Sequence, residues 1–175
     1  MWKLKRGNAY SEQWDKMLHC NLETEFKAYR YLCEDMGIRE RKRYEKKEKI
    51  VFQKYSKWES HISEQLKELP NNEAKKEFEK FLSHKARIAN SSNTVSLNYL
   101  FPLLTACVGA YMNDFFHIVF NESNLITLVF GILLFLVSLV WLIEMVYKEV
   151  RYMDLKKAFF EDVLEILNNM DKNEG

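Results

Sequence analysis

Side chains that could do catalytic or metal chemistry are few in this sequence and widely dispersed. Neither the histidines nor the cysteines show the spacing of a zinc site or a disulfide framework. No nucleophile elbow, phosphate-binding loop or dinucleotide-binding glycine motif occurs. We therefore expect no catalytic residue, no metal, no cofactor and no enzymatic activity. The residues concerned are His19, His61, His84, His117, Cys20, Cys33 and Cys107.

One pair, His84 and Arg87, has a spacing that places an imidazole beside a guanidinium. Residues three positions apart are neighbours on a helix surface, so these two side chains should meet. A solvated surface pair is the simpler interpretation, and a ribonuclease site built on the pair is the alternative.

The basic run Arg39–Lys49 is a second feature, with seven basic and three acidic residues. It is either a solvated helix surface or a patch that contacts anionic lipid headgroups or an RNA backbone. The interleaved acids weaken the nucleic-acid interpretation. The contact candidates are Arg39, Arg41, Lys42, Arg43, Lys46 and Lys47.

A stripe of polar or small residues runs through an otherwise apolar segment. Its members recur at steps of 4, 3, 4 and 4 residues and so share one helical face. They are Asn98, Pro102, Thr105, Gly109 and Asn113. An asparagine left alone in hydrocarbon is costly, so the stripe must face protein or water. Pro102 also predicts a kink, because proline removes a backbone hydrogen bond from the helix.

Two interpretations of the stripe stay open. Either it packs against a neighbouring helix, or it lines a channel enclosed by several copies of the chain, because a single hairpin cannot surround a pore. In the channel interpretation Asp114 and Glu122 place acids around the outer mouth and weakly favour cations.

Two apolar segments, Val95–Met112 and Leu125–Ile143, are expected to be membrane spans. The second has 19 residues and no charge, and a helix of about 20 apolar residues crosses a bilayer core. No Lys or Arg lies between Arg87 and Lys148. This distribution predicts that both termini are cytoplasmic. The alternative for the first segment, extended to Phe120, is one long kinked span or a buried soluble helix.

Outside these segments, apolar residues at helical spacing predict amphipathic helices. The ranges are Asn8–Met36, Arg39–Leu69, Glu73–Ala89 and Lys148–Met170. The first three faces comprise Trp14, Leu18, Leu22, Tyr29, Leu32 and Met36; Val51, Tyr55, Trp58, Ile62, Leu66 and Leu69; and Phe78, Phe81, Leu82, Ile88 and Ala89. The last comprises Tyr152, Phe159 or Phe160, Val163, Ile166 or Leu167, and Met170.

Breaks between these helices are also predicted. Gly37 should end the first helix, and the polar residues 90–94 should interrupt the chain before the membrane, with Asn93 or Thr94 as a cap. The last helix could run on directly from the second span, with Glu144 and Lys148 one turn apart.

The sequence as a whole predicts an all-α protein. Only 5 Gly and 2 Pro occur among 175 residues, which disfavours strands and disorder. We expect a cytoplasmic helical region at residues 1–93, a two-span transmembrane hairpin at 94–147 with an extracytoplasmic connector at 113–124, and a cytoplasmic C-terminal helix at 148–175. The cytoplasmic helices should form a bundle, and the hairpins a ring-like homo-oligomer.

This layout resembles the small accessory membrane proteins found beside the RNA-guided ribonuclease of type VI-B CRISPR systems. The resemblance implies an oligomeric pore in the bacterial inner membrane that strengthens antiphage defence by depolarising the cell. It also implies a divergent helical domain of the HEPN nuclease type. That type carries an Arg followed by His after four to six residues, and no such pair precedes any histidine here.

The layout also resembles the two-span effector modules of bacterial nucleotide-signalling conflict systems, which are likewise proposed pores. We therefore expect an oligomeric inner-membrane pore that enhances RNA-targeting antiviral defence. The expected partners are the lipid bilayer, further copies of the chain, and an RNA-guided ribonuclease or its RNA products. The alternatives are a membrane-anchored scaffold that recruits a cytoplasmic partner and a membrane-tethered HEPN-like ribonuclease.

Overall fold

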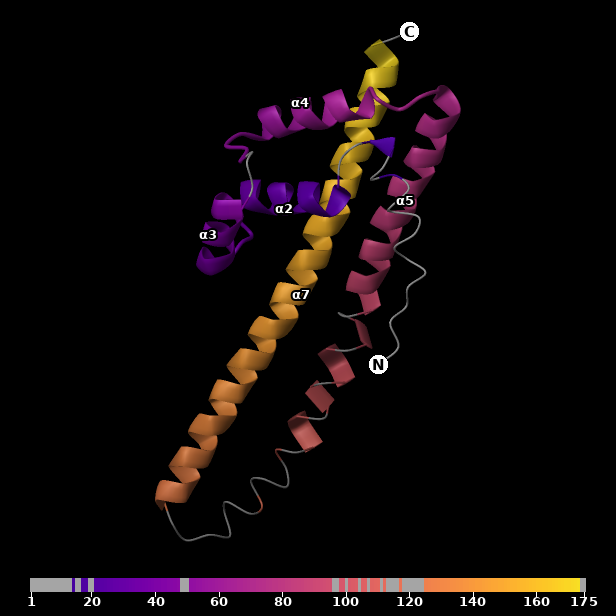
Figure 1. Cartoon of the computed structure of the whole chain (residues 1–175). Coiled ribbons are helices and arrows are strands. Elements are labelled where there is room, and N and C mark those ends of the chain that lie inside the picture. Colours follow the sequence, from indigo (N-terminus) through magenta and orange to yellow (C-terminus); the bar gives the residue numbers. More distant parts are fainter. Residues whose placement is uncertain are drawn as a thin grey trace. The chain divides into compact units, whose positions relative to one another are not determined.

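The computed structural model describes residues 14, 17, 18, 21–47, 51–95, 98, 99, 101–103, 105, 106, 108–110, 112, 117 and 125–173. Across these residues every regular element is a helix and no strand occurs, which confirms the all-α expectation (Figure 1). The labelled helices are α2 (Leu22–Leu32), α3 (Ile38–Lys47), α4 (Tyr55–Leu66), α5 (Asn72–Val95) and α7 (Leu125–Asn173).

Two compact units divide these helices. The first, here called the helical domain, comprises Met1–Arg87 and Leu155–Gly175. The second, here called the apolar unit, comprises Ile88–Asp154. Because α5 and α7 each contribute a segment to both units, the helical domain is assembled from two separate stretches of sequence.

The core of the helical domain is an aromatic cluster formed where α2 and α4 cross the C-terminal part of α7 (Figure 1). Trp58 of α4 and Phe159 of α7 have 0% exposed surface, and their ring centroids lie 6.0 Å apart. Tyr29 of α2 lies 5.1 Å from Trp58 and 5.6 Å from Phe159. Three helices thus meet on one group of rings, and tilted or edge-on contacts of this kind add about 0.5–1.5 kcal/mol each beyond burial.

A second aromatic group attaches α5 to the domain. Trp14 is 1% exposed, and its ring lies 5.0 Å from Phe78 and 6.1 Å from Phe81. The neighbouring Leu82 is fully buried. The apolar face predicted for residues 73–89 is therefore the face that α5 buries, except that Ile88 is exposed and Ala86 is buried instead.

The expectation of one helix over Asn8–Met36 is wrong. The chain leaves helical geometry at Asn21 (φ −104°, ψ 109°), whose side chain accepts a hydrogen bond from the Thr24 N–H at 3.0 Å. This is the arrangement of an N-cap, which starts a new helix. At the other end, Glu34 takes a positive φ of 56°, and Gly37 precedes α3 instead of ending α2.

Two further boundaries also differ from expectation. The range Arg39–Leu69 holds two helices, α3 and α4, with an extended Lys54 (φ −137°, ψ 141°) immediately before α4. Conversely, no break occurs at residues 90–94, because α5 continues to Val95. The Thr94 hydroxyl donates to the carbonyl of Asn90 at 3.0 Å, so this polar group is satisfied within the helix and does not cap a new one.

The last helix does continue from the second apolar segment. α7 is one helix of 49 residues, and Glu144 and Lys148 form an ion pair at 2.6 Å on its surface. Its predicted C-terminal face is confirmed, and most of that face is buried. The buried members are Phe159, Phe160, Val163, Ile166, Leu167 and Met170, and Tyr152 is half-buried.

Candidate functional site

By length and composition, α7 is the one described helix able to cross a membrane, through an apolar window in the part that begins at Val129. No residue of that window is buried within the chain, whereas a helix that is apolar all round is covered in a soluble protein. The first expected span is represented by a shorter apolar helix, Phe101–Ala110, so the two-span hairpin stays a prediction. The outward-facing large residues of α7 include Phe130, Leu133, Leu134, Leu136, Val137, Val140 and Trp141.

Four members of the polar stripe are described, and all four are exposed: Asn98, Pro102, Thr105 and Gly109. A Cβ atom added to Gly109 would meet nothing within 4 Å. The Thr105 hydroxyl donates to the carbonyl of Phe101 at 2.8 Å, so its oxygen can still accept. Within the described part of the chain, the stripe is therefore not covered by the second apolar segment. Asn113, Asp114 and Glu122 lie outside the described residues.

The stripe begins at an irregular turn. Asn98 and Tyr99 have π-helical geometry, just before Pro102. In an α-helix the carbonyl of residue i accepts from the N–H of residue i+4, and proline has no N–H to give. A π turn uses the N–H of residue i+5 instead. The departure from α geometry thus lies where Pro102 leaves a carbonyl without its usual donor.

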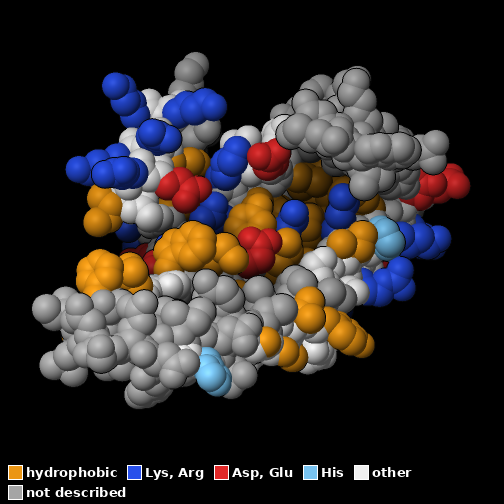
Figure 2. Space-filling view, turned by 90° about the horizontal axis from the view of Figure 1, so that it is seen from below, with side chains coloured by type: hydrophobic (Ala, Val, Ile, Leu, Met, Phe, Trp, Pro, Cys, Tyr) orange, Lys and Arg blue, Asp and Glu red, His pale blue; other side chains and the backbone are white. Residues whose placement is uncertain are grey.

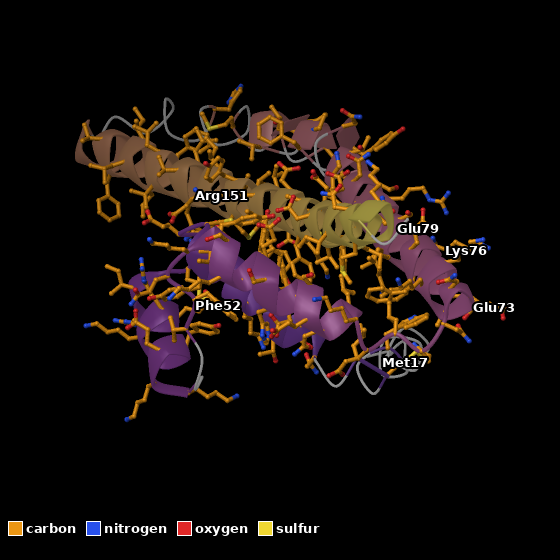
Figure 3. All side chains as sticks on the ribbon, turned by 90° about the horizontal axis from the view of Figure 1, so that it is seen from above. Met17, Phe52, Glu73, Lys76, Glu79 and Arg151 are labelled. Carbon is orange, nitrogen blue, oxygen red and sulfur yellow. The ribbon has the colours of Figure 1, made fainter. Side chains whose placement is uncertain are left out.

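In α3 the acidic and basic residues of the run lie on different faces of the helix. Glu40 accepts from Arg30 of α2 at 2.8 Å, and Glu45 accepts from the Tyr31 hydroxyl at 2.8 Å. Arg41 lies over the Tyr31 ring, 4.5 Å from its centroid. The acids and Arg41 are therefore turned toward α2, and the remaining basic side chains are left on the other side. Figure 2 shows several Lys and Arg side chains gathered at one edge of the face it draws, and Figure 3 shows long side chains with nitrogen at their ends projecting outward from α3.

A carboxylate that no sequence pattern indicates, Asp162 of α7, joins the three core helices. Its Oδ2 atom accepts from the Tyr29 hydroxyl at 2.8 Å and from the Tyr55 hydroxyl at 3.0 Å. Burial, and secondarily the hydrogen bond to Asp162, raise the pKa of Tyr29 and of Tyr55 above the ordinary tyrosine value. Both phenols therefore stay protonated donors at neutral pH.

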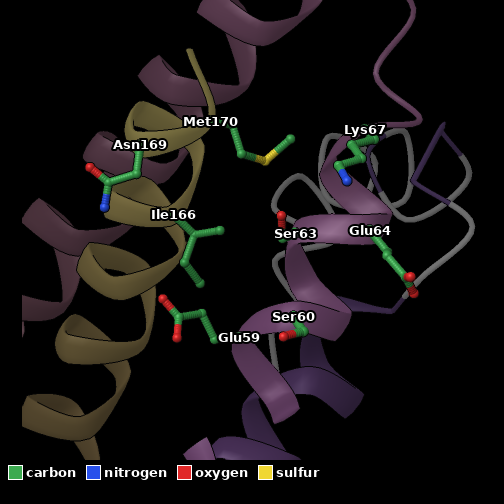
Figure 4. Close-up of a pocket in the computed structure, with 8 residues that line it drawn as sticks. All are labelled: Glu59, Ser60, Ser63, Glu64, Lys67, Ile166, Asn169 and Met170. Atoms are coloured by element: carbon green, nitrogen blue, oxygen red, sulfur yellow. The ribbon is translucent and has the colours of Figure 1, made fainter. Parts of the chain in front are cut away.

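A groove of about 410 Å³ lies between α4 and the C-terminal part of α7 (Figure 4). One wall is polar and carries Glu59, Ser60 and Ser63, and the other carries Ile166 and Asn169. The groove is open and has no imidazole or thiol in its lining, so its side chains suit recognition of a surface more than catalysis.

Two of the described histidines, His61 and His84, make close side-chain contacts, and neither forms a catalytic constellation. His61 lies 3.4 Å from the Oε1 atom of Glu25, which is 8% exposed, and its ring lies 5.1 Å from Phe52 (labelled in Figure 3). His84 lies 3.1 Å from an Arg87 guanidinium nitrogen at the surface. The predicted contact of that pair is confirmed, and its exposure matches a solvated surface pair. Among the described residues no group of His, Cys, Asp and Glu could hold a metal ion.

No protein-family model, curated protein or solved structure matches this chain.

Proposed function

We propose that the chain is a bacterial inner-membrane protein in which a two-span hairpin holds a cytoplasmic helical domain at the bilayer. The observation that carries this proposal is the apolar part of α7, which has the length of a span and is not buried within the chain. In water such a surface would be a large exposed apolar patch, which soluble monomers rarely present. In lipid it needs no cover.

The topology follows from charge. Lys80, Lys85 and Arg87 precede the first apolar segment, and Lys148 and Arg151 follow the second. Between them no basic residue occurs. Since basic residues are retained on the cytoplasmic side, both termini face the cytoplasm in this proposal and the connector faces outward.

We further propose that several copies of the hairpin enclose an ion-conducting pore lined by the stripe that contains Asn98, Thr105 and Gly109. The support is the exposure of these positions and the open space at Gly109. A polar residue at membrane depth needs protein or water beside it, because hydrocarbon offers no hydrogen-bond partner. Such a pore would depolarise the cell and so enhance RNA-targeting antiphage defence, with an RNA-guided ribonuclease or its RNA products as the partner. No catalytic step is assigned to the chain.

Ion flux from liposomes reconstituted with the purified full chain tests the pore. We expect flux that rises with protein load, and less flux from Asn98→Leu, which replaces the amide by an apolar group with the same number of heavy atoms and no charge. Phe130→Leu, a matched change on the exposed apolar surface of α7, should leave flux unchanged. Tight liposomes at high protein load, or a monomer or dimer by mass in detergent, would refute the pore.

A membrane-anchored scaffold is the second candidate, and the groove between α4 and α7 favours it. A recess with several hydroxyls and carboxylates can accept a partner without any pore. Replacing both spans by an unrelated hairpin separates the two functions. Retained defence in such a chimera supports the scaffold, and lost defence with a folded, membrane-integrated chimera supports the pore.

A further inference from the structure

The structure points to a second membrane contact, and we propose that one face of α3 docks on anionic lipid headgroups. This face, here called the basic face, consists of Arg39, Lys42, Arg43, Lys46 and Lys47. The inference rests on the membrane attachment proposed above and adds a specific ligand chemistry, the phosphodiester of an anionic phospholipid in the bilayer that holds the chain.

Helical geometry gathers these five side chains on one side. Successive helix residues are turned by about 100°, so the five basic residues fall within about 140° of arc. All five are exposed, and no ion pair joins them to a carboxylate in the described part of the chain. The surface is therefore a continuous strip of positive charge.

The two acids of the run that the structure describes, Glu40 and Glu45, do not neutralise this strip, and the third, Glu48, lies outside the described residues. Glu40 is held by Arg30 at 2.8 Å. Glu45 is held by Tyr31 at 2.8 Å and lies 3.6 Å from Arg41. Both carboxylates thus face α2 or lie beside it, and their charge is matched there. Basic and acidic residues alternate along the sequence of α3, but in the fold the basic face and these two acids lie on different sides of the helix.

The chemistry of the basic face favours a lipid surface over RNA. Single-stranded RNA is held chiefly by rings on which its bases stack, and the two rings near this helix are already occupied. Tyr44 is buried, and its ring lies 5.3 Å from that of Tyr31. The Arg41 guanidinium in turn lies over the Tyr31 ring, 4.5 Å from its centroid. Ile38, in contrast, begins α3 with 78% of its surface exposed, and an apolar residue beside basic ones is typical of helices that lie on a membrane.

Because α7 would hold the chain at the membrane, even a weak attraction between the basic face and the lipid headgroups is sufficient for docking. A tethered ligand-binding face meets its own bilayer at high effective concentration, and each basic side chain close to an anionic leaflet strengthens association roughly fivefold. Because the contact is electrostatic, it should weaken with salt, which shortens the screening length from about 10 Å at 0.1 M to about 3 Å at 1 M.

Hydrogen exchange of the full chain in lipid nanodiscs tests the proposal. One set of discs contains phosphatidylcholine alone, and the other contains phosphatidylcholine with phosphatidylglycerol. We expect the amides of α3 to exchange at least about fivefold more slowly in the anionic discs, and the protection to disappear at high salt. The amides of the buried part of α4 serve as the internal reference and should not change.

The triple variant Lys42→Gln, Arg43→Gln and Lys46→Gln should abolish the difference between the two kinds of disc. These side chains are exposed, so the variant should keep the wild-type circular dichroism. The matched control is Lys54→Gln, Lys57→Gln and Lys76→Gln, which removes the same charge from exposed positions just before α4, in α4 and in α5 and should keep the lipid-dependent protection.

Two outcomes would overturn the inference. Equal exchange of α3 in both discs would show that anionic lipid does not bind it. Protection by added polyuridine RNA in neutral discs, without any effect of phosphatidylglycerol, would assign the face to nucleic acid. Vesicle flotation after an alkaline wash is measured in parallel: a chain that does not float refutes the membrane proposal itself, whereas a floating chain with unprotected α3 refutes the docking alone.

Discussion

Trp58 and Phe159 in the helical domain expose no surface, whereas Phe130 and Leu134 in the apolar part of α7 leave more than half of theirs uncovered. Both regions are rich in large apolar side chains, and both are helical. The difference is that apolar residues of the domain recur on one stripe and meet other helices, while those of α7 point in all directions. This difference is what the proposed function requires, because a domain surrounded by water buries its apolar side chains and a helix surrounded by hydrocarbon does not need to.

The largest effect on stability should come from a substitution in the buried core of the helical domain. Phe159→Ala removes a fully buried ring that contacts Tyr29 and Trp58, and should destabilise the helical domain by about 3–5 kcal/mol. Urea unfolding of the full chain in detergent, followed by tryptophan fluorescence, measures the change. Phe130→Ala, the matched truncation on exposed α7, should change the same transition by no more than about 0.5 kcal/mol. Equal losses for the two variants would erase the distinction.

A charge placed on the exposed apolar part of α7 tests whether that surface lies in lipid. Leu134→Arg is an exposed substitution that would cost about 0.5 kcal/mol or less in water, but about 2.5–3.5 kcal/mol at the centre of a membrane helix. We expect the alkali-resistant membrane fraction to fall markedly. Glu64→Arg, on the exposed surface of α4, introduces the same side chain and should leave that fraction intact. An unchanged fraction for Leu134→Arg means that this surface is not in lipid.

The hydrogen bonds to Asp162 predict a smaller, pH-dependent effect. Tyr29→Phe removes one of the two phenol donors and should cost about 1.5 kcal/mol, since the acceptor is charged. The pKa of Tyr29 and of Tyr55 is raised by folding, so their stabilisation is complete below the unfolded value of about 10 and is lost as the pH rises above it.

Unfolding measured from neutral pH to above pH 10 checks whether stability falls as these phenols ionise. The wild type should lose stability more steeply than the double variant Tyr29→Phe, Tyr55→Phe, because the variant has no phenols to ionise at this position. Parallel curves for the two proteins would mean that these tyrosines titrate in the folded state as they do in the unfolded chain.

The smallest expected effect concerns a helix end. Asn21→Ala removes the side-chain acceptor of the Thr24 N–H and should cost about 1 kcal/mol. Asn21→Gly, which tolerates the same backbone, should cost only a few tenths of a kcal/mol. The same urea transition measures both variants, and equal losses would contradict the role of Asn21 as a cap.

Sequence periodicity predicted the buried faces well, because a helix that packs on one side repeats its apolar residues every turn. Trp58, Ile62 and Leu66 were found this way and are buried. Periodicity could not find the helix ends: the pattern from Val51 to Leu69 is unbroken by any Gly, and the chain between α3 and α4 gives no strong turn signal. Those ends depend on local capping and on tertiary contacts.

The candidate sites were predictable in composition but not in arrangement. The basic residues of α3 are evident in the sequence, yet their separation from Glu40 and Glu45 depends on Arg30 and Tyr31 in another helix. Asp162 was not predicted at all, since its partner Tyr29 lies 133 positions away. One acid among several in an amphipathic helix gives no sign that it is a hydrogen-bond acceptor for two phenols.

The length of α7 has one more consequence. A single unbroken ladder of backbone hydrogen bonds runs from Leu125 to Asn173, so the angular phase of every later side chain is set by the count of residues before it. Deleting one residue between Lys148 and Leu155 would turn Phe159 and Asp162 by about 100° about the helix axis relative to Glu144, with composition almost unchanged. Inserting seven residues there would nearly restore the phase, to within about 20°. The number of residues in this stretch therefore sets the direction of the later side chains, whichever amino acids occupy it.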